Sequence, residues 1–116
     1  MSSHNLAWAA VVVAGLLEIG WAVGFKYAFR SNHLITAATL AAMWASFGLL
    51  LYAVRSLPIG TAYAVWTGIG AVGAATIGVL FLREPATAMR LLSIGLIVGG
   101  IVGLRLSQAA PGSSPA

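Results

Sequence analysis

Four long apolar segments, separated by short polar stretches, make up nearly the whole chain. They cover about residues 6–25, 34–54, 59–82 and 88–106. A helix of about 20 apolar residues is long enough to cross the hydrocarbon core of a bilayer. The fourth segment has the shortest uncharged run, and it spans the core only if Arg90 and Arg105 extend their charged ends toward the membrane surfaces. The pattern therefore predicts an all-α membrane protein with four transmembrane helices per chain.

The composition agrees with this pattern and limits the domain organisation. Of the 116 residues, 60% are hydrophobic and 7% are charged, and the mean hydropathy is +0.98. These values exclude an ordinary soluble domain and leave no room for a second domain of any size. We expect residues 1–107 to form one transmembrane domain. Residues 108–116 are small, polar and contain proline, so we expect a disordered tail there.

The charged and metal-binding residue types indicate neither an enzyme nor a nucleic-acid-binding protein. Cysteine is absent, and the two histidines, His4 and His33, stand in polar flanks, so no metal site and no cofactor are predicted. The formal net charge of +4 comes from cations at the ends of the apolar segments. Cations in such positions anchor helices at the membrane interface, and we expect no nucleic-acid partner.

The cations also give a weak signal for orientation. Four helices place both termini on one side of the membrane, together with Arg55 and Arg105, while the other side holds Lys26, Arg30, Arg83 and Arg90. The positive-inside rule then places the termini outside. The margin is small, however, and a bias this weak permits insertion in both orientations.

One acidic residue stands inside the first apolar segment. Glu18 is the only charged residue between Leu6 and Phe25, so its carboxyl group lies well within the hydrocarbon layer. An acid at that depth is expected to pair with a cation, to face water or to take up a proton. A carboxyl group poised in this way can exchange a proton for a cation. The alternative is a structural acid that forms a hydrogen bond with a neighbouring helix.

The neighbours of Glu18 on its helix face suit a binding site. The residues three and four positions away are Ala14, Gly15, Trp21 and Ala22, which share that face of a helix. Small residues leave space beside the acid, and the indole of Trp21 offers an aromatic face to a cation. The same residues would also suit tight helix packing, so this face alone does not distinguish the two interpretations.

The third segment carries a second group of candidate residues, which share one helix face: Tyr63, Trp66, Thr67 and Gly70. Aromatic residues at this spacing more commonly serve packing than binding. When such residues lie opposite a buried carboxyl group, binding becomes a better interpretation than packing. We expect Tyr63 to donate a hydrogen bond to Glu18 and Trp66 to form a second wall of the site.

Two glycine patterns complete the set of motifs. Residues 68–73 match the pattern G-x-G-x-x-G, but the strand and the acidic residue that a dinucleotide site requires are missing, so we expect these glycines to permit close helix packing and a bend. Gly95, Gly99 and Gly103 recur at a spacing of four, which lets two helices approach closely. We expect these three to form a dimer contact, with packing inside one chain as the alternative.

Taken together, these residues resemble the small multidrug resistance transporters over nearly all of residues 6–106. The resemblance rests on residues 14–21 (AGLLEIGW) and residues 58–71 (PIGTAYAVWTGIGA). The Gly-Thr before Ala-Tyr-Ala and the Thr-Gly-Ile-Gly-Ala after the tryptophan are similar to the guanidinium exporter branch of that family, rather than to its quaternary-ammonium branch.

The resemblance implies an antiparallel, dual-topology homodimer in the cytoplasmic membrane, in which Glu18 of both subunits alternately binds protons and substrate. It also implies substrate-site roles for Gly15, Trp21, Ser46, Tyr63 and Trp66. Among these, the hydroxyl of Ser46 would help to orient the acid. The glycines of the fourth segment would carry the dimer contact.

The function expected from this resemblance is proton-coupled export of guanidinium and small substituted guanidinium ions. Two alternatives remain open at the level of sequence. One is a broad-range exporter of quaternary ammonium and other drug cations, because the chain holds aromatic residues as well as a carboxyl group. The other is a partner subunit of a heterodimeric pair that does not transport by itself.

Overall fold

The computed structural model describes residues 3–28 and 32–109, and within these ranges the chain is helical apart from short connections. The four helices are α1 (Ser3–Tyr27), α2 (His33–Ala53), α3 (Ile59–Phe81) and α4 (Ala88–Ala109). Each contains a stretch of 20 to 24 residues that is long and apolar enough to cross a membrane. The prediction of an all-α protein with four membrane-spanning helices is therefore confirmed.

The ends of the helices have local causes in the sequence. Asn32 precedes α2, and its side chain accepts a hydrogen bond from the backbone N–H of Ile35 at 2.9 Å, which satisfies an amide that has no partner within the helix. Pro58 precedes α3, where its fixed φ suits a helix start. After α3, the backbone N–H groups of Leu82 and Glu84 both donate to the carbonyl of Gly78, and Arg83 adopts a φ of 60° in the left-handed region.

The end of α4 differs from the expected boundary. Gln108 and Ala109, which we expected in a disordered tail, belong to the last turn of the helix. Both residue types form helices readily, and no proline or glycine stands between Gly103 and Ala109 to end the helix earlier. Residues 110–116 lie outside the described residues, as do residues 29–31 of the expected first link, which include Arg30.

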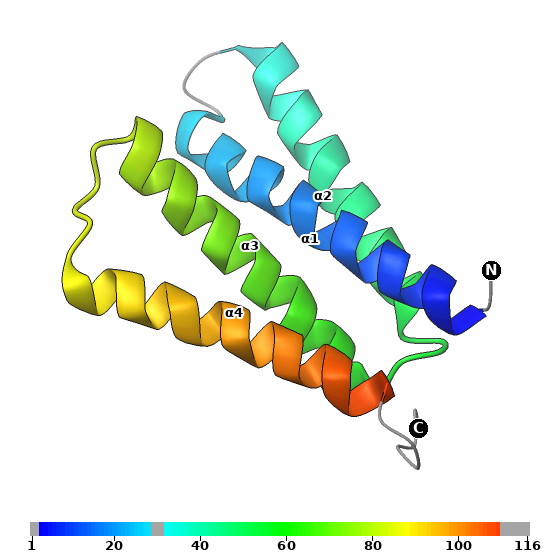
Figure 1. The fold of residues 1–116 in the computed structure, drawn as a ribbon. Helices are drawn as coiled ribbons and strands as arrows, with labels where there is room; N and C mark the ends of the chain where they lie inside the picture. Colours follow the sequence, from blue (N-terminus) through cyan, green and yellow to red (C-terminus); the bar gives the residue numbers. More distant parts are fainter. Residues whose placement is uncertain (1–2, 29–31, 110–116) are drawn as a thin grey trace.

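The helices lie side by side in the order α2, α1, α3, α4, with both termini at the same end (Figure 1). α1 packs closely against α2 and α3, whereas α4 packs closely against α3 alone. The principal dimensions are 49 × 35 × 20 Å, and 20 Å is about two helix diameters. The radius of gyration is 15.5 Å, compared with roughly 13 Å for a compact domain of this length. One chain is therefore a thin slab.

Small side chains bring α1 and α3 together. The buried core contains Ala7, Val11 and Ala14 of α1 and Ala62 and Val65 of α3. Small residues at helix interfaces let backbones approach closely, and in a membrane this close packing replaces the hydrophobic effect as the source of association. The tight α1–α3 contact thus places Glu18 of α1 against the third helix.

The glycines of residues 68–73 serve helix packing, as the sequence suggested. A Cβ atom at Gly68 would lie 2.9 Å from the side chain of Ile101 in α4. On the other side of α3, added Cβ atoms at Gly70 and Gly73 would overlap the side chains of Glu18 and Ile19 in α1. The three glycines therefore allow α3 to pack closely against α4 on one side and α1 on the other.

Candidate functional site

Glu18 lies in the middle of α1 with its carboxyl group against the backbone of Gly70 in α3. Any side chain at Gly70 would occupy the space that the carboxyl group fills. The residue is partly buried, although it belongs to a helix in which all its near neighbours are apolar or glycine. The absence of a side chain at Gly70 thus leaves space for one acidic side chain between the two helices.

Two atoms of this region have unused hydrogen-bonding capacity. Among the buried side-chain oxygen and nitrogen atoms of the described residues, Oε1 of Glu18 and Nε1 of Trp21 have no hydrogen-bond partner. Buried polar groups are almost always satisfied, because leaving one without a partner costs free energy. One turn of α1 therefore presents an acceptor and a donor that are both available for a ligand or a proton.

Ser46 of α2 connects three helices next to the acid. Its hydroxyl group donates to the carbonyl of Ala14 in α1 at 2.7 Å and accepts from the indole N–H of Trp66 in α3 at 2.9 Å. In an α-helix, the carbonyl of Ala14 also accepts the backbone N–H of Glu18, four residues later. Ser46 and Trp66 thus hold the turn of α1 that carries the acid, and they do so through its backbone.

An aromatic cluster surrounds this connection. Phe47 of α2 lies at its centre, with ring centroids 5.9 Å from Trp21, 5.8 Å from Trp44 and 5.7 Å from Trp66. The interplanar angles of 64° to 88° are typical of edge-to-face contacts, which are the favoured geometry for aromatic pairs. Trp21 and Trp66, the two predicted walls of the site, therefore meet through Phe47.

Tyr63 lies on the margin of this cluster. Its ring centroid is 5.6 Å from that of Trp66, and 50% of the residue is exposed. We expected a hydrogen bond from Tyr63 to Glu18, and within the described part of the chain no such bond joins them. The rotation of α3 explains the difference, because it directs Gly70 toward Glu18 and leaves the Tyr63 side chain on an exposed part of the helix.

The predicted glycines fall into two groups. A Cβ atom at Gly15 would lie 2.7 Å from the Cβ atom of Ile69, so Gly15 permits the close contact between α1 and α3. By contrast, Gly95, Gly99 and Gly103 are exposed, and a Cβ atom at any of them would meet no other atom within 4 Å among the described residues. The packing of α4 within one chain therefore makes no use of these three.

The sequence places Gly70 on the candidate face with Tyr63 and Trp66, and in the structure this glycine lies directly beside the acid. Phe47 is the residue of the site that the sequence does not indicate. Phe47 gave no signal of its own, because it is one apolar residue in a segment that is apolar throughout. A contact across three helices was required to reveal it.

Four apolar helices, one of which carries a partly buried acid, define a multi-pass integral membrane protein. The family model described as Small Multidrug Resistance protein matches residues 6–97. A guanidinium exporter from Citrobacter freundii is 55% identical over 103 residues, which cover 88% of this chain and 98% of that protein. A guanidinium exporter from Yersinia pseudotuberculosis is 55% identical over 104 residues, which cover 89% of this chain and 100% of that protein. A guanidinium exporter from Salmonella typhimurium is 54% identical over 103 residues, which cover 88% of this chain and 98% of that protein.

This chain belongs to the small multidrug resistance family. Its four apolar helices and its exporter relatives identify it as a multi-pass protein of the bacterial inner membrane.

Proposed function

We propose that this chain exports guanidinium and small substituted guanidinium ions across the cytoplasmic membrane in exchange for protons. The observation that carries the proposal is the Glu18 carboxyl group, which lies inside an apolar helix and has a buried oxygen with no hydrogen-bond partner. The relatives that are named guanidinium exporters cover nearly the whole chain and supply the substrate class.

The coupling between proton and substrate follows from their competition for one group. An ionised carboxylate in apolar surroundings is unfavourable without a partner, so Glu18 holds either a proton or an organic cation. Each therefore displaces the other. When the site is exposed alternately to the two sides of the membrane, this competition couples export of the cation to import of protons, and the proton gradient drives the exchange.

Guanidinium suits this site by its shape. The ion is planar and presents parallel N–H donors that match the two oxygens of a carboxylate. Buried Oε1 of Glu18 is an acceptor in need of such a donor. A quaternary ammonium ion has no donors and would depend on the aromatic faces of Trp21, Phe47 and Trp66 alone.

The active unit in this proposal is an antiparallel homodimer with dual topology. One chain is a slab 20 Å thick, which is too thin to surround a cation at Glu18. Gly95, Gly99 and Gly103 are exposed on α4, where they permit a second α4 to approach closely. Two copies in opposite orientations place two Glu18 side chains in one shared site.

The other site residues act around the acid. Trp21 and Trp66 bound the space beside the substrate, and the half-exposed Tyr63 faces the second copy. Ser46 is a positioning residue, since it bonds to the carbonyl of Ala14 on the turn that carries Glu18. Gly15 keeps α1 close to α3, so that the acid rests against Gly70.

The experiment is proton release from the detergent-purified protein when guanidinium is added. The wild type releases protons near neutral pH, whereas Glu18→Gln releases none. Because a lower pH favours the protonated acid, the apparent affinity for guanidinium falls as the pH falls, by up to about tenfold per pH unit for one displaced proton. If Glu18→Gln still releases protons, or if the wild-type affinity is independent of pH, the exchange mechanism is wrong.

A comparison of substrates separates the alternatives. In proteoliposomes with an imposed pH gradient, guanidinium and methylguanidinium are expected to be transported, and tetramethylammonium and tetraethylammonium are not. Transport of all four with similar efficiency would identify a broad cation exporter instead. A chain that releases no protons with any of them, but does so after a homologous partner is added, would be one half of a heterodimer.

A further inference from the structure

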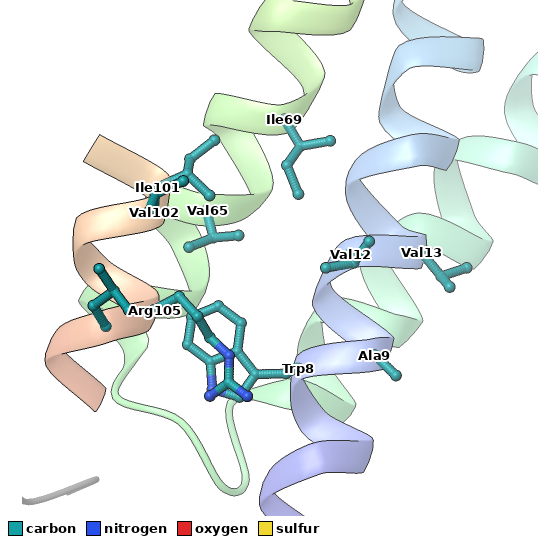
Figure 2. Close-up of a pocket in the computed structure, with 10 residues that line it drawn as sticks. Trp8, Ala9, Val12, Val13, Val65, Ile69, Ile101, Val102 and Arg105 are labelled. Atoms are coloured by element: carbon teal, nitrogen blue, oxygen red, sulfur yellow. The ribbon is translucent and has the colours of Figure 1, made fainter. Parts of the chain in front are cut away.

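A groove separate from the Glu18 site runs along α4. It has a volume of about 570 Å³ and is lined by residues of three helices, among them Trp8 and Val12 of α1, Val65 and Ile69 of α3, and Val102 and Arg105 of α4 (Figure 2). Glu18 is not part of its lining. The groove is apolar except at Arg105, so it combines a hydrophobic wall with one fixed cation.

Arg105 is held over the face of Trp8 at the end of the groove. The guanidinium carbon lies 4.9 Å from the centre of the ring, within the range of a cation–π contact. Trp8 is fixed in turn, because its indole N–H donates to Nε2 of His4 at 3.1 Å and only 7% of the residue is exposed. The contact links α4 to α1, two helices whose backbones do not pack closely.

The cation of Arg105 has no carboxylate partner in the part of the chain that the structure describes. The sequence contains only two acidic side chains. Glu84 is paired with Arg90 at the opposite end of α4, and Glu18 lies in the middle of α1. The contact with Trp8 is a cation–π contact, which does not use the N–H donors of the guanidinium group as hydrogen bonds to a carboxylate, and these donors suit an anion.

The groove and its continuation extend over about two thirds of one leaflet of a bilayer. Beyond the main groove, a further hollow of about 290 Å³ shares Ile69, Ile101 and Val102 with it and extends to Val98 of α4. From Arg105 to Val98 the helix rises about 10 Å, which is two thirds of a leaflet of about 15 Å. A charged group at the interface and an apolar path toward the bilayer centre are the two parts of a phospholipid site.

We propose that this groove binds an anionic phospholipid, with an acyl chain along α4 and the phosphate of its headgroup at Arg105. The charge of the groove selects this occupant, because a zwitterionic lipid brings its own cation whereas an anionic headgroup does not. Val12, Val13 and Val102 are 41% to 51% exposed in one chain, so a lipid would cover apolar surface that the fold leaves open.

A second copy of the chain is the competing occupant, because the groove adjoins the glycine stripe. Val98 and Val102 lie three residues after Gly95 and Gly99, and residues three apart share a helix face. The charge distinguishes the two occupants: an anionic headgroup pairs directly with Arg105, whereas an apolar helix face offers that cation no partner. A second copy that filled the groove would exclude lipid from it, and the test below detects that outcome.

The test measures which lipid lies beside Trp8. The protein is reconstituted in phosphatidylcholine vesicles that contain a small fraction of lipid with brominated acyl chains, which quench nearby tryptophan. The brominated lipid is phosphatidylglycerol in one series and phosphatidylcholine in the other. The difference between the wild type and Trp8→Phe isolates the fluorescence of Trp8 from that of the other three tryptophans.

We expect brominated phosphatidylglycerol to quench Trp8 about fivefold more effectively than brominated phosphatidylcholine, which is the preference that one interfacial cation provides. Arg105→Gln should remove the preference, and Arg105→Lys should retain part of it. Arg55→Gln is the matched control, because it removes a cation from the connection between α2 and α3, which lies at the same end of the bundle as the termini (Figure 1), and Arg55 does not line the groove. It should leave the preference unchanged.

Two results would overturn the proposal. Equal preference in the wild type and Arg105→Gln would show that Arg105 does not recognise the headgroup. No quenching of Trp8 by either lipid would show that protein, such as a second copy, fills the groove. If Arg105→Gln does not fold, the difference between the wild type and Trp8→Phe still decides: excess unlabelled phosphatidylglycerol must relieve the quenching of Trp8, and the same excess of phosphatidylcholine must not.

Discussion

The two acidic residues of the chain make a direct comparison, because both rest against glycines of α3 and yet differ in every other respect. Glu18 lies against Gly70 in the middle of the bundle, and its buried oxygen has no partner. Glu84 lies against Gly78 at the end of α3, where it forms an ion pair with Arg90. The Glu84 and Arg90 side chains are 38% and 30% exposed.

The difference separates an acid that supports structure from one that is available for chemistry. Glu84 finishes the connection between α3 and α4, since its backbone N–H donates to Gly78 and its carboxylate is neutralised by Arg90. Nothing in the described residues neutralises Glu18. Two glutamates that each pack against a glycine of α3 thus differ in function, because the fold supplies a cation to one of them and none to the other.

The largest expected effect comes from neutralising each acid in turn. Glu18→Gln should reduce pH-driven guanidinium transport by about a hundredfold or more, because a charged group that binds a cation in apolar surroundings is lost. Glu84→Gln should retain transport within about twofold, since an exposed ion pair contributes little. Uptake of labelled guanidinium into proteoliposomes measures both, and comparable losses would show that the two acids act as one system.

An intermediate effect is expected from adding a methyl group at each of the two glycines that contact an acid. In Gly70→Ala the new methyl group occupies the position of the Glu18 carboxyl group, and a displaced binding group should lower transport by about tenfold. Gly78→Ala crowds Glu84 instead, and it should lower the free energy of unfolding by about 1 kcal/mol with transport nearly unchanged. The reverse pattern, in which Gly78→Ala impairs transport more than Gly70→Ala, would contradict this assignment.

The smallest effect is expected from removing the cation of the structural pair. Arg90→Gln should change the free energy of unfolding by less than about 1 kcal/mol, because the pair is partly exposed to solvent. Denaturation in mixed micelles, followed by circular dichroism, measures this change. Transport should be preserved, and a loss on the scale of the Glu18 variant would mean that the α3–α4 connection takes part in exchange.

The number and position of the helices could be predicted from the sequence. A bilayer requires about 20 apolar residues per crossing; three of the four segments meet that requirement, and the fourth meets it when Arg90 and Arg105 extend toward the membrane surfaces. The ends were less certain, as Gln108 and Ala109 show, because a helix continues past the membrane surface until a residue such as proline stops it. The isolated Glu18 was recognisable for the same reason as the helices, since one charge in an apolar run is conspicuous.

The rotation of each helix about its own axis could not be predicted in the same way. In a soluble protein, polar residues mark the outer face of a helix, but here both faces of each helix are apolar. Close packing of small residues decides the rotation instead, and it directs Gly70 toward Glu18 and leaves Tyr63 half exposed. Phe47 and the two hydrogen bonds of Ser46 depend on the same rotations.

The thin profile of the chain has a consequence for the cell. If a working exporter needs two slabs, the fraction of paired chains follows mass action within the plane of the membrane. At low surface density most chains would remain single, with the acid facing lipid tails instead of a partner. Gene dosage would then set a threshold for export, below which synthesis of the protein moves almost no substrate.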